Sequence, residues 1–197
     1  MKVLVFDTET TGKPIDYNGA ITDLDNWPRV IQLGWAYIEG SRWEEASVSY
    51  TESLIKPDGW EIPEEKFWID NGYSTEKNDA LGVPMPQILD AFIEDLNKAD
   101  IIVAHNMAFD YPVLCAEMIR YDTKAEKKER KKVCTMQEST NFCKIPGKYR
   151  NYKWPNLTEL HTKLFGVGFD GAHDVLSDVK ACAASFFKLV ELNVIKL

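Results

Sequence analysis

Short apolar runs alternate with polar, turn-rich stretches along the 197-residue chain. Runs of four to nine apolar or β-branched residues between turn signals indicate strands. The first run is apolar at every position, which is typical of a central strand that is covered on both faces. Strands are therefore expected at Val3–Phe6, Val30–Ile38, Val48–Ile55, Ile101–Ala104 and Val133–Met136.

Apolar residues at intervals of three and four indicate amphipathic helices in the second half of the chain. Because proline is tolerated only in the first helical turn, a helix ending near Ile119 should begin close before Pro112. Strands followed by alternating helices and strands predict an α/β protein with a mixed central sheet in one domain, residues 1–197. The expected helical segments are Glu64–Leu81 (short pieces), Met85–Leu96, a helix from close before Pro112 to about Ile119, Leu157–Phe165 and Asp174–Leu192.

Two connections are longer than the fold requires. Lys13–Arg29 separates the first two strands, and its Ile21–Pro28 part is expected to cover the active edge or bind a partner. Lys144–Asn156 is also extended, and it interleaves lysines and arginine with aromatic residues. Bases can stack on aromatic rings while cations meet phosphates, so this second segment suits contact with a nucleic-acid strand.

The net charge of -8 argues weakly against a nucleic-acid partner, but it hides an asymmetry. Arg120–Lys153 holds 11 basic and 4 acidic residues, whereas the rest of the chain is strongly acidic. Such a basic zone can guide a polyanion to one edge of the molecule. Within it, Ala125–Lys132 mixes both signs at helical spacing and favours a solvated helix face.

Composition places the protein among soluble globular chains. The four cysteines form neither a C-x-x-C pair nor a zinc spacing, so reduced thiols and a cytoplasmic location are expected. No apolar run approaches the roughly 20 residues that span a bilayer, so no membrane partner is expected. The acidic Asp7 argues against a signal peptide. The oligomeric state cannot be read from the sequence.

Four acidic residues and one histidine are the candidate catalytic groups. Asp7 and Glu9 follow the first apolar run and, two residues apart on a strand, should face the same side. Asp110 comes a few residues after the fourth strand, so it can face the same sheet edge. His173 and Asp178 flank the start of the last helix.

Carboxylates gathered at one edge suit hard cations, because Mg²⁺ prefers oxygen ligands. Two such ions about 3.5–4 Å apart would bracket a scissile phosphate. A neutral imidazole at His173 suits the general base. His105 and His161 have an ordinary structural interpretation, and Asp174 is expected to cap the last helix.

Three motifs in this order resemble the DEDDh exonucleases, the family of the proofreading epsilon subunit of bacterial DNA polymerase III. Asp7–Gly12 reads D-T-E-T-T-G, His105–Asp110 reads H-N-M-A-F-D, and His173 with Asp178 gives H-x-x-x-x-D. The motifs span nearly the whole chain. The D-x-E and H-x-x-x-x-D patterns are weak alone, and their combination is specific.

The resemblance implies a ribonuclease H-like fold and release of 5′-mononucleotides from a 3′ end. We expect the enzyme to act on single-stranded ends, with DNA favoured over RNA. It implies two Mg²⁺ ions, for which Mn²⁺ can substitute, and it leaves a DNA polymerase partner open. Because only a short stretch follows the last helix in the sequence, a long tail of the kind that could hold a polymerase is not expected. The implied metal ligands are Asp7, Glu9, Asp110 and Asp178, the implied base is His173, and the implied substrate contacts are Thr8, Thr10, Asn106 and Phe109.

Three other functions stay open at this point. A small-RNA exonuclease of the same family would differ in its response to the 2′-hydroxyl group. The protein could also be a catalytically silent nucleic-acid-binding or polymerase-accessory module, which would release no mononucleotides. The presence of all five catalytic-type residues argues against this alternative. A phosphatase with an aspartyl nucleophile would favour D-x-D over D-x-E, and it leaves His173 and Asp178 unexplained.

Overall fold

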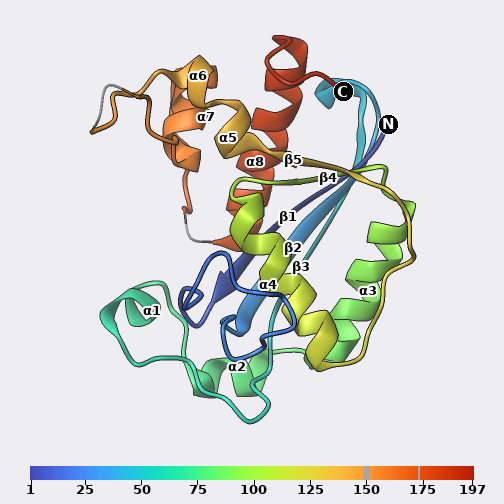
Figure 1. Cartoon of the computed structure of the whole chain (residues 1–197), viewed down its shortest axis with the longest axis vertical. Helices are drawn as coiled ribbons and strands as arrows, with labels where there is room; N and C mark the ends of the chain where they lie inside the picture. Colours follow the sequence, from blue (N-terminus) through green and yellow to red (C-terminus); the bar gives the residue numbers. More distant parts are fainter. Residues whose placement is uncertain (149–150, 173) are drawn as a thin grey trace.

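A five-stranded sheet lies at the centre of the computed structural model of the chain (Figure 1), which describes residues 1–148, 151–172 and 174–197. The strand order is β3-β2-β1-β4-β5. The first three strands pair antiparallel, and β1, β4 and β5 pair parallel, so the sheet is mixed. The strands are β1 (Lys2–Thr10), β2 (Val30–Glu39), β3 (Ser47–Leu54), β4 (Ile101–Ala104) and β5 (Lys131–Cys134).

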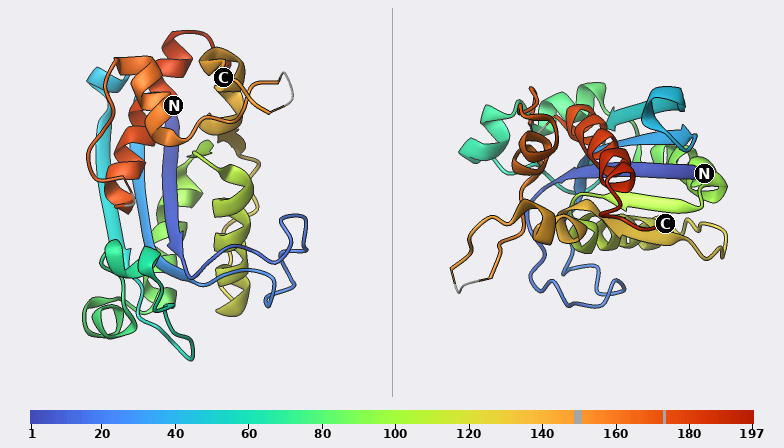
Figure 2. Two further views of the ribbon diagram at one scale, coloured as in Figure 1. Left: turned by 90° about the vertical axis from the view of Figure 1, so that its left-hand side faces the viewer. Right: turned by 90° about the horizontal axis from the view of Figure 1, so that it is seen from above.

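Helices cover both faces of this sheet (Figure 2). Alternate residues of β1 enter two cores: Leu4 and Phe6 pack with α3 and α4, whereas Val3 and Val5 pack with α8. The described helices are η1 (Trp43–Glu45), α1 (Lys66–Asp70), α2 (Thr75–Leu81), α3 (Met85–Lys98), α4 (Met107–Arg120), α5 (Thr135–Glu138), α6 (Thr140–Cys143), α7 (Leu157–Phe165) and α8 (Val175–Glu191).

The expected α/β class with a mixed sheet is confirmed, and most helices and strands lie within a few residues of their predicted bounds. Asp174 caps α8, because its side chain accepts a hydrogen bond from the backbone N–H of Ser177 at 3.1 Å. The four cysteines are free thiols. Among the described residues, no helix combines the length and the apolar character that crossing a bilayer would need.

The expectation for α4 was wrong at its start. The helix begins at Met107, and Pro112 lies inside it rather than in its first turn. The helix thus accepts the loss of one backbone hydrogen bond at Pro112, and it starts early enough to place Asp110 in its first turn.

The expectation of a solvated helix at Ala125–Lys132 was also wrong. Residues 123–130 have no regular secondary structure, and Lys131 and Lys132 belong to β5. The segment has charges at helical spacing but no apolar face to bury, so tertiary contacts decide its shape. Arg130, for example, donates from Nε to the carbonyl of Leu96 at the end of α3.

The fifth strand is shorter than expected at one end. Thr135 and Met136 were assigned to it, but they begin α5. The first strand is longer than its apolar run, since β1 continues past Phe6 to Thr10. It contains Asp7 and Glu9, as expected from their alternation on a strand.

Candidate active site

Three carboxylates from β1 and α8 lie close enough to share a cation. One carboxylate oxygen of each of Asp7, Glu9 and Asp178 lies within 4.8 Å of the other two. Asp7 and Glu9 alternate with buried neighbours on β1, and Asp178 lies in the first turn of α8. The donor atoms are all oxygen, which fits a hard divalent cation such as Mg²⁺.

A fourth carboxylate, Asp110, reaches the same place from α4. It is buried, and its Oδ1 accepts a hydrogen bond from the hydroxyl of Thr8 at 2.8 Å and a longer one from the Thr8 backbone N–H at 3.3 Å. Thr8 lies between Asp7 and Glu9 on β1, and it faces the opposite side of the strand. The bond therefore fixes α4 to the strand that carries the other acids.

Mutual repulsion in a poorly solvated site shows in the pKa values of these carboxyls. Burial, followed by the charges of Asp110, Asp178 and Glu9, raises the pKa of Asp7 well above its ordinary value. Burial and the charges of Asp178 and Asp110 raise the pKa of Glu9 to about 8. Burial likewise raises the pKa of Asp110 to about 7, although its bonds from Thr8 act in the other direction. Such a cluster favours proton or cation binding, since either relieves the repulsion.

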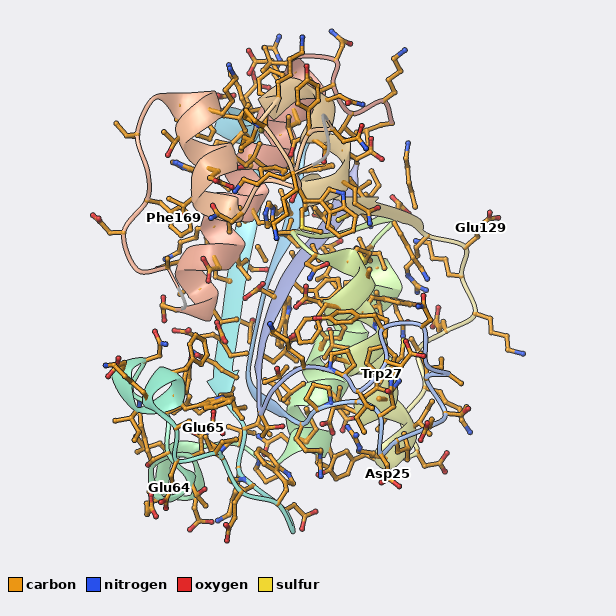
Figure 3. The ribbon with its side chains drawn as sticks, turned by 60° about the vertical axis from the view of Figure 1, so that its left-hand side comes forward. Asp25, Trp27, Glu64, Glu65, Glu129 and Phe169 are labelled. Atoms are coloured by element: carbon orange, nitrogen blue, oxygen red, sulfur yellow. The ribbon has the colours of Figure 1, made fainter. Side chains whose placement is uncertain are left out.

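The acids form the floor of a pocket of about 390 Å³. Its walls come from the start of α4, the start of α7 and the segment before α8, from which Phe169 is labelled in Figure 3. The lining residues outside the acids are Thr8, His105, Asn106, Phe109, Asn156, Leu157, Thr158, Phe169 and Ala172.

His105 links two of these walls. Its Nε2 lies 3.1 Å from the carbonyl oxygen of Pro155, and its Nδ1 lies 3.0 Å from Oγ1 of Thr135. A carbonyl can only accept, so Nε2 carries the hydrogen and Nδ1 accepts from the Thr135 hydroxyl. Burial lowers the pKa of His105 to about 4, and the neutral ring holds the residues before α7 against the end of β4.

A glycine on β2 allows α8 to approach β1 closely. Gly34 pairs with Asp7 in the sheet register. A Cβ atom added to Gly34 would lie 2.9 Å from Cγ1 of Val175, the first residue of α8. The absence of a side chain at this position therefore brings the first turn of α8, with Asp178, to the acids of β1.

An exonuclease family profile, RNase T exonuclease, matches residues 4–186. The chain belongs to this exonuclease family. The resemblance to the DEDDh, or DnaQ-like, exonucleases is thereby confirmed at the level of the family. No curated protein sequence matches the chain significantly.

Solved structures of exonucleases share the fold of the chain. E. coli Exonuclease I in complex with a dT13 oligonucleotide has a TM-score of 0.71 at 18% identity, covering 96% of this chain and 41% of Exonuclease I. The nuclease domain of 3′hExo, a DEDDh family member bound to rAMP, has a TM-score of 0.69 at 15% identity, covering 98% and 93%. The chain thus spans less than half of Exonuclease I and nearly all of the 3′hExo domain.

Most of the predicted site residues of this DEDDh exonuclease come together. Asp7, Glu9, Asp110 and Asp178 share the pocket floor, and Asn106 and Phe109 line its wall. His173 lies outside the described residues. Of the two threonines expected to meet substrate, Thr8 lines the pocket, whereas the Thr10 hydroxyl donates to the carbonyl of Gly12 at 2.7 Å, and Thr10 is not among the described lining residues.

Sequence reasoning missed one wall of the exonuclease pocket. Asn156, Leu157 and Thr158 lie outside the three motifs, although Asn156 ends the segment that was expected to contact a nucleic-acid strand. His105 begins the second motif but received an ordinary structural interpretation. The available signal was the N-cap pattern of Asn156 and Glu159 at the start of α7, a capping box in the structure. That pattern predicts where the helix begins, but not that its first turn faces the acids.

Proposed function

We propose that the protein is a metal-dependent 3′–5′ exonuclease that releases 5′-mononucleotides from single-stranded ends, with DNA favoured over RNA. The observation that carries the proposal is the convergence of four carboxylates from three distant segments in one pocket. Hydrolysis of a phosphodiester needs compensation for negative charge, and this cluster is built to hold the cations that supply it.

Asp7, Glu9, Asp110 and Asp178 would hold two Mg²⁺ ions, with Mn²⁺ as a substitute. When bound, such ions lower the pKa of an attacking water and neutralise charge on the leaving oxygen. The raised pKa values of Glu9 and Asp110 support this assignment, because a cluster of this kind is costly to leave charged and without cations.

The remaining residues would position the end of the strand. Phe109 offers a ring to the terminal base, and Asn106 offers an amide at the start of α4. Thr8 holds Asp110, and Thr10 shapes the backbone turn at Gly12. His173 is proposed as the general base on its sequence motif alone.

The preference for DNA over RNA has no support from the geometry of the pocket. The solved structures with this fold include one with a DNA oligonucleotide and one with rAMP, so the fold accommodates both sugars in those proteins. A small-RNA exonuclease is accordingly the second candidate. A polymerase partner and a cytoplasmic location stay predictions of the sequence.

Degradation of end-labelled oligonucleotides tests the proposal. With Mg²⁺, 5′-labelled single-stranded DNA should shorten one nucleotide at a time, and 3′-labelled DNA should release labelled mononucleotide at once. Matched RNA should react more slowly. Asp7→Asn should abolish release, whereas Asp90→Asn, an exposed control on α3, should not. Activity that survives chelation of divalent ions, or release from the 5′ end, would show the proposal to be wrong.

A further inference from the structure

The connection of residues 13–29 is a built structure that projects beside the pocket, and we call it the 13–29 loop. Asn26 closes it, because its side chain accepts from the backbone N–H of Asp16 at 2.7 Å and donates to the Asp16 carbonyl at 2.9 Å. Trp27 is buried in the core shared with α4 (Figure 3). The loop therefore has a defined shape, held by its own hydrogen bonds and by the packing of Trp27.

The base of the loop is tied to α4 through one buried carboxylate. Glu117 accepts from Nε of Arg29 at 2.9 Å and from Nη1 of Arg120 at 3.0 Å. Arg120 also donates to the carbonyls of Leu24 and Trp27 at 2.6 and 2.7 Å. The first turns of the same helix carry Phe109 and Asp110, so the loop and one pocket wall share a rigid support.

The loop presents apolar side chains to solvent instead of burying them. Ile15, Tyr17 and Ile21 are 85%, 51% and 42% exposed. The ring centroid of Tyr17 lies 6.5 Å from that of Phe109, at an interplanar angle of 46°. Because Phe109 lines the pocket, an aromatic surface continues from the pocket wall onto the loop. The contact between Tyr17 and Phe109 therefore extends the aromatic lining of the pocket onto an exposed side chain that a ligand can reach.

Charge indicates which part of a nucleic acid meets this surface. Lys13 begins the loop, and Arg29 at its end is paired with Glu117. Between them the exposed carboxylates of Asp16, Asp23 and Asp25 repel phosphates. The connection after α6, which leads to the α7 wall, carries the exposed Lys144 and Lys148 instead. Both connections project to the same side of the molecule (Figure 2). A strand between them would place its phosphates toward the lysines and its bases toward the loop.

We propose that the 13–29 loop is a base-stacking platform, and that Tyr17 receives a base next to the terminal nucleotide of a single-stranded substrate. This inference rests on the proposed nuclease function. Aromatic stacking tolerates any base, so the platform positions the strand without reading its sequence. It also supplies a role for a connection that is longer than the fold requires.

Steady-state kinetics of Tyr17 variants test the platform. Tyr17→Ala should raise KM on single-stranded DNA about fivefold or more, with a smaller change in kcat. Tyr17→Phe should behave as wild type, because the ring remains. Tyr50→Ala is the matched control, since Tyr50 is 39% exposed on β3 and does not line the pocket.

Oligonucleotides with abasic positions next to the 3′ nucleotide sharpen the test. On these oligonucleotides the KM of wild type should rise to that of Tyr17→Ala, and the KM of Tyr17→Ala should not rise further. Lys148→Ala should reduce the salt dependence of KM, whereas Tyr17→Ala should not.

Three outcomes would overturn the platform. The first is an unchanged KM for Tyr17→Ala. The second is a rise in KM from wild type to Tyr17→Ala that is equally large on normal and on abasic DNA. The third is a Tyr17→Ala variant whose solution mass changes while its KM does not. The last would indicate a protein contact at the loop. A wild-type protein that releases no mononucleotide would refute the proposed function itself, which is a different result from an active enzyme indifferent to Tyr17.

Discussion

The hydroxyl of Thr8 donates to Oδ1 of Asp110 at 2.8 Å, across 102 positions of sequence. Both residues are buried, and the bond holds one carboxylate in a fixed orientation beside the other three. A residue that matches the first family motif thus also orients a residue of the second.

Thr8→Val should weaken metal binding while preserving side-chain volume. Loss of the hydroxyl leaves Asp110 with only the longer bond from the Thr8 backbone N–H, at 3.3 Å, and so holds the carboxylate less firmly. Outer contacts of metal ligands are typically worth 10- to 100-fold in metal affinity. The measurement is nuclease rate against Mg²⁺ concentration. Thr8→Ser keeps the donor and should stay near wild type, so an equal loss in both variants would point to packing rather than to the hydrogen bond.

Stability of the metal-free protein should fall as pH rises. The pKa of Glu9 is raised to about 8 and that of Asp110 to about 7, so the folded state retains protons that the unfolded chain releases near pH 4. Between about pH 4 and pH 8, each unit by which the pH rises therefore lowers the free energy of unfolding. Thermal melts with chelator should show a midpoint that declines from about pH 5 to pH 8.

Divalent cations should reverse that decline. At pH 8, Mg²⁺ or Mn²⁺ should raise the melting temperature of the wild type, because binding to the folded state alone stabilises it. Asp7→Asn should start from a higher metal-free midpoint, since one buried like charge is gone, and should gain little from the cations. A wild-type midpoint indifferent to cations at pH 8 would argue against the metal site.

His105 should make the protein sensitive to acid. Its folded pKa of about 4 lies below the unfolded value of about 6.5, so the unfolded chain takes up a proton first as pH falls. The stability that His105 contributes is present above about pH 6.5 and is lost between there and pH 4, by at most about 3 kcal/mol. Denaturant melts of wild type and His105→Asn should converge as pH falls through this window, and parallel curves would contradict the assignment.

Gly34→Ala should lower the nuclease rate at least tenfold without unfolding the protein. Its methyl group would lie 2.9 Å from Val175 and push the start of α8, with Asp178, away from Asp7. Small displacements of catalytic groups are costly in rate. Val175→Ala in the same chain makes room and should restore much of the activity. A double variant as slow as Gly34→Ala would show that the contact does not set the position of Asp178.

Sequence reasoning reached the acids because their placement follows from local rules. Alternation on a strand puts Asp7 and Glu9 on one side, and the helix that Asp174 caps places Asp178 one turn later. The α/β order of elements then brings Asp110 to the same edge. These steps need only the periodicity of strands and helices and the position of β1 at the centre of the sheet.

The rest depended on contacts that no local rule describes. The bond between His105 and the Pro155 carbonyl decides that α7 forms a wall of the pocket, and it joins residues 50 positions apart. Pro112 inside α4 and the irregular segment at 123–130 are cases in which tertiary packing outweighed propensity. The inward approach of α8 follows from a missing side chain at Gly34, which no pattern of hydrophobicity records.

The buried carboxylate of Glu117 gives the far end of α4 an unexpected influence. It fixes Arg29 and Arg120, and through them the shape of the 13–29 loop, without being exposed to solvent itself. Substitutions around this anchor would re-aim the loop while leaving the metal ligands untouched. If the loop positions a strand as proposed, the choice among nucleic-acid ends would respond to substitutions at Glu117, a buried position outside the pocket lining.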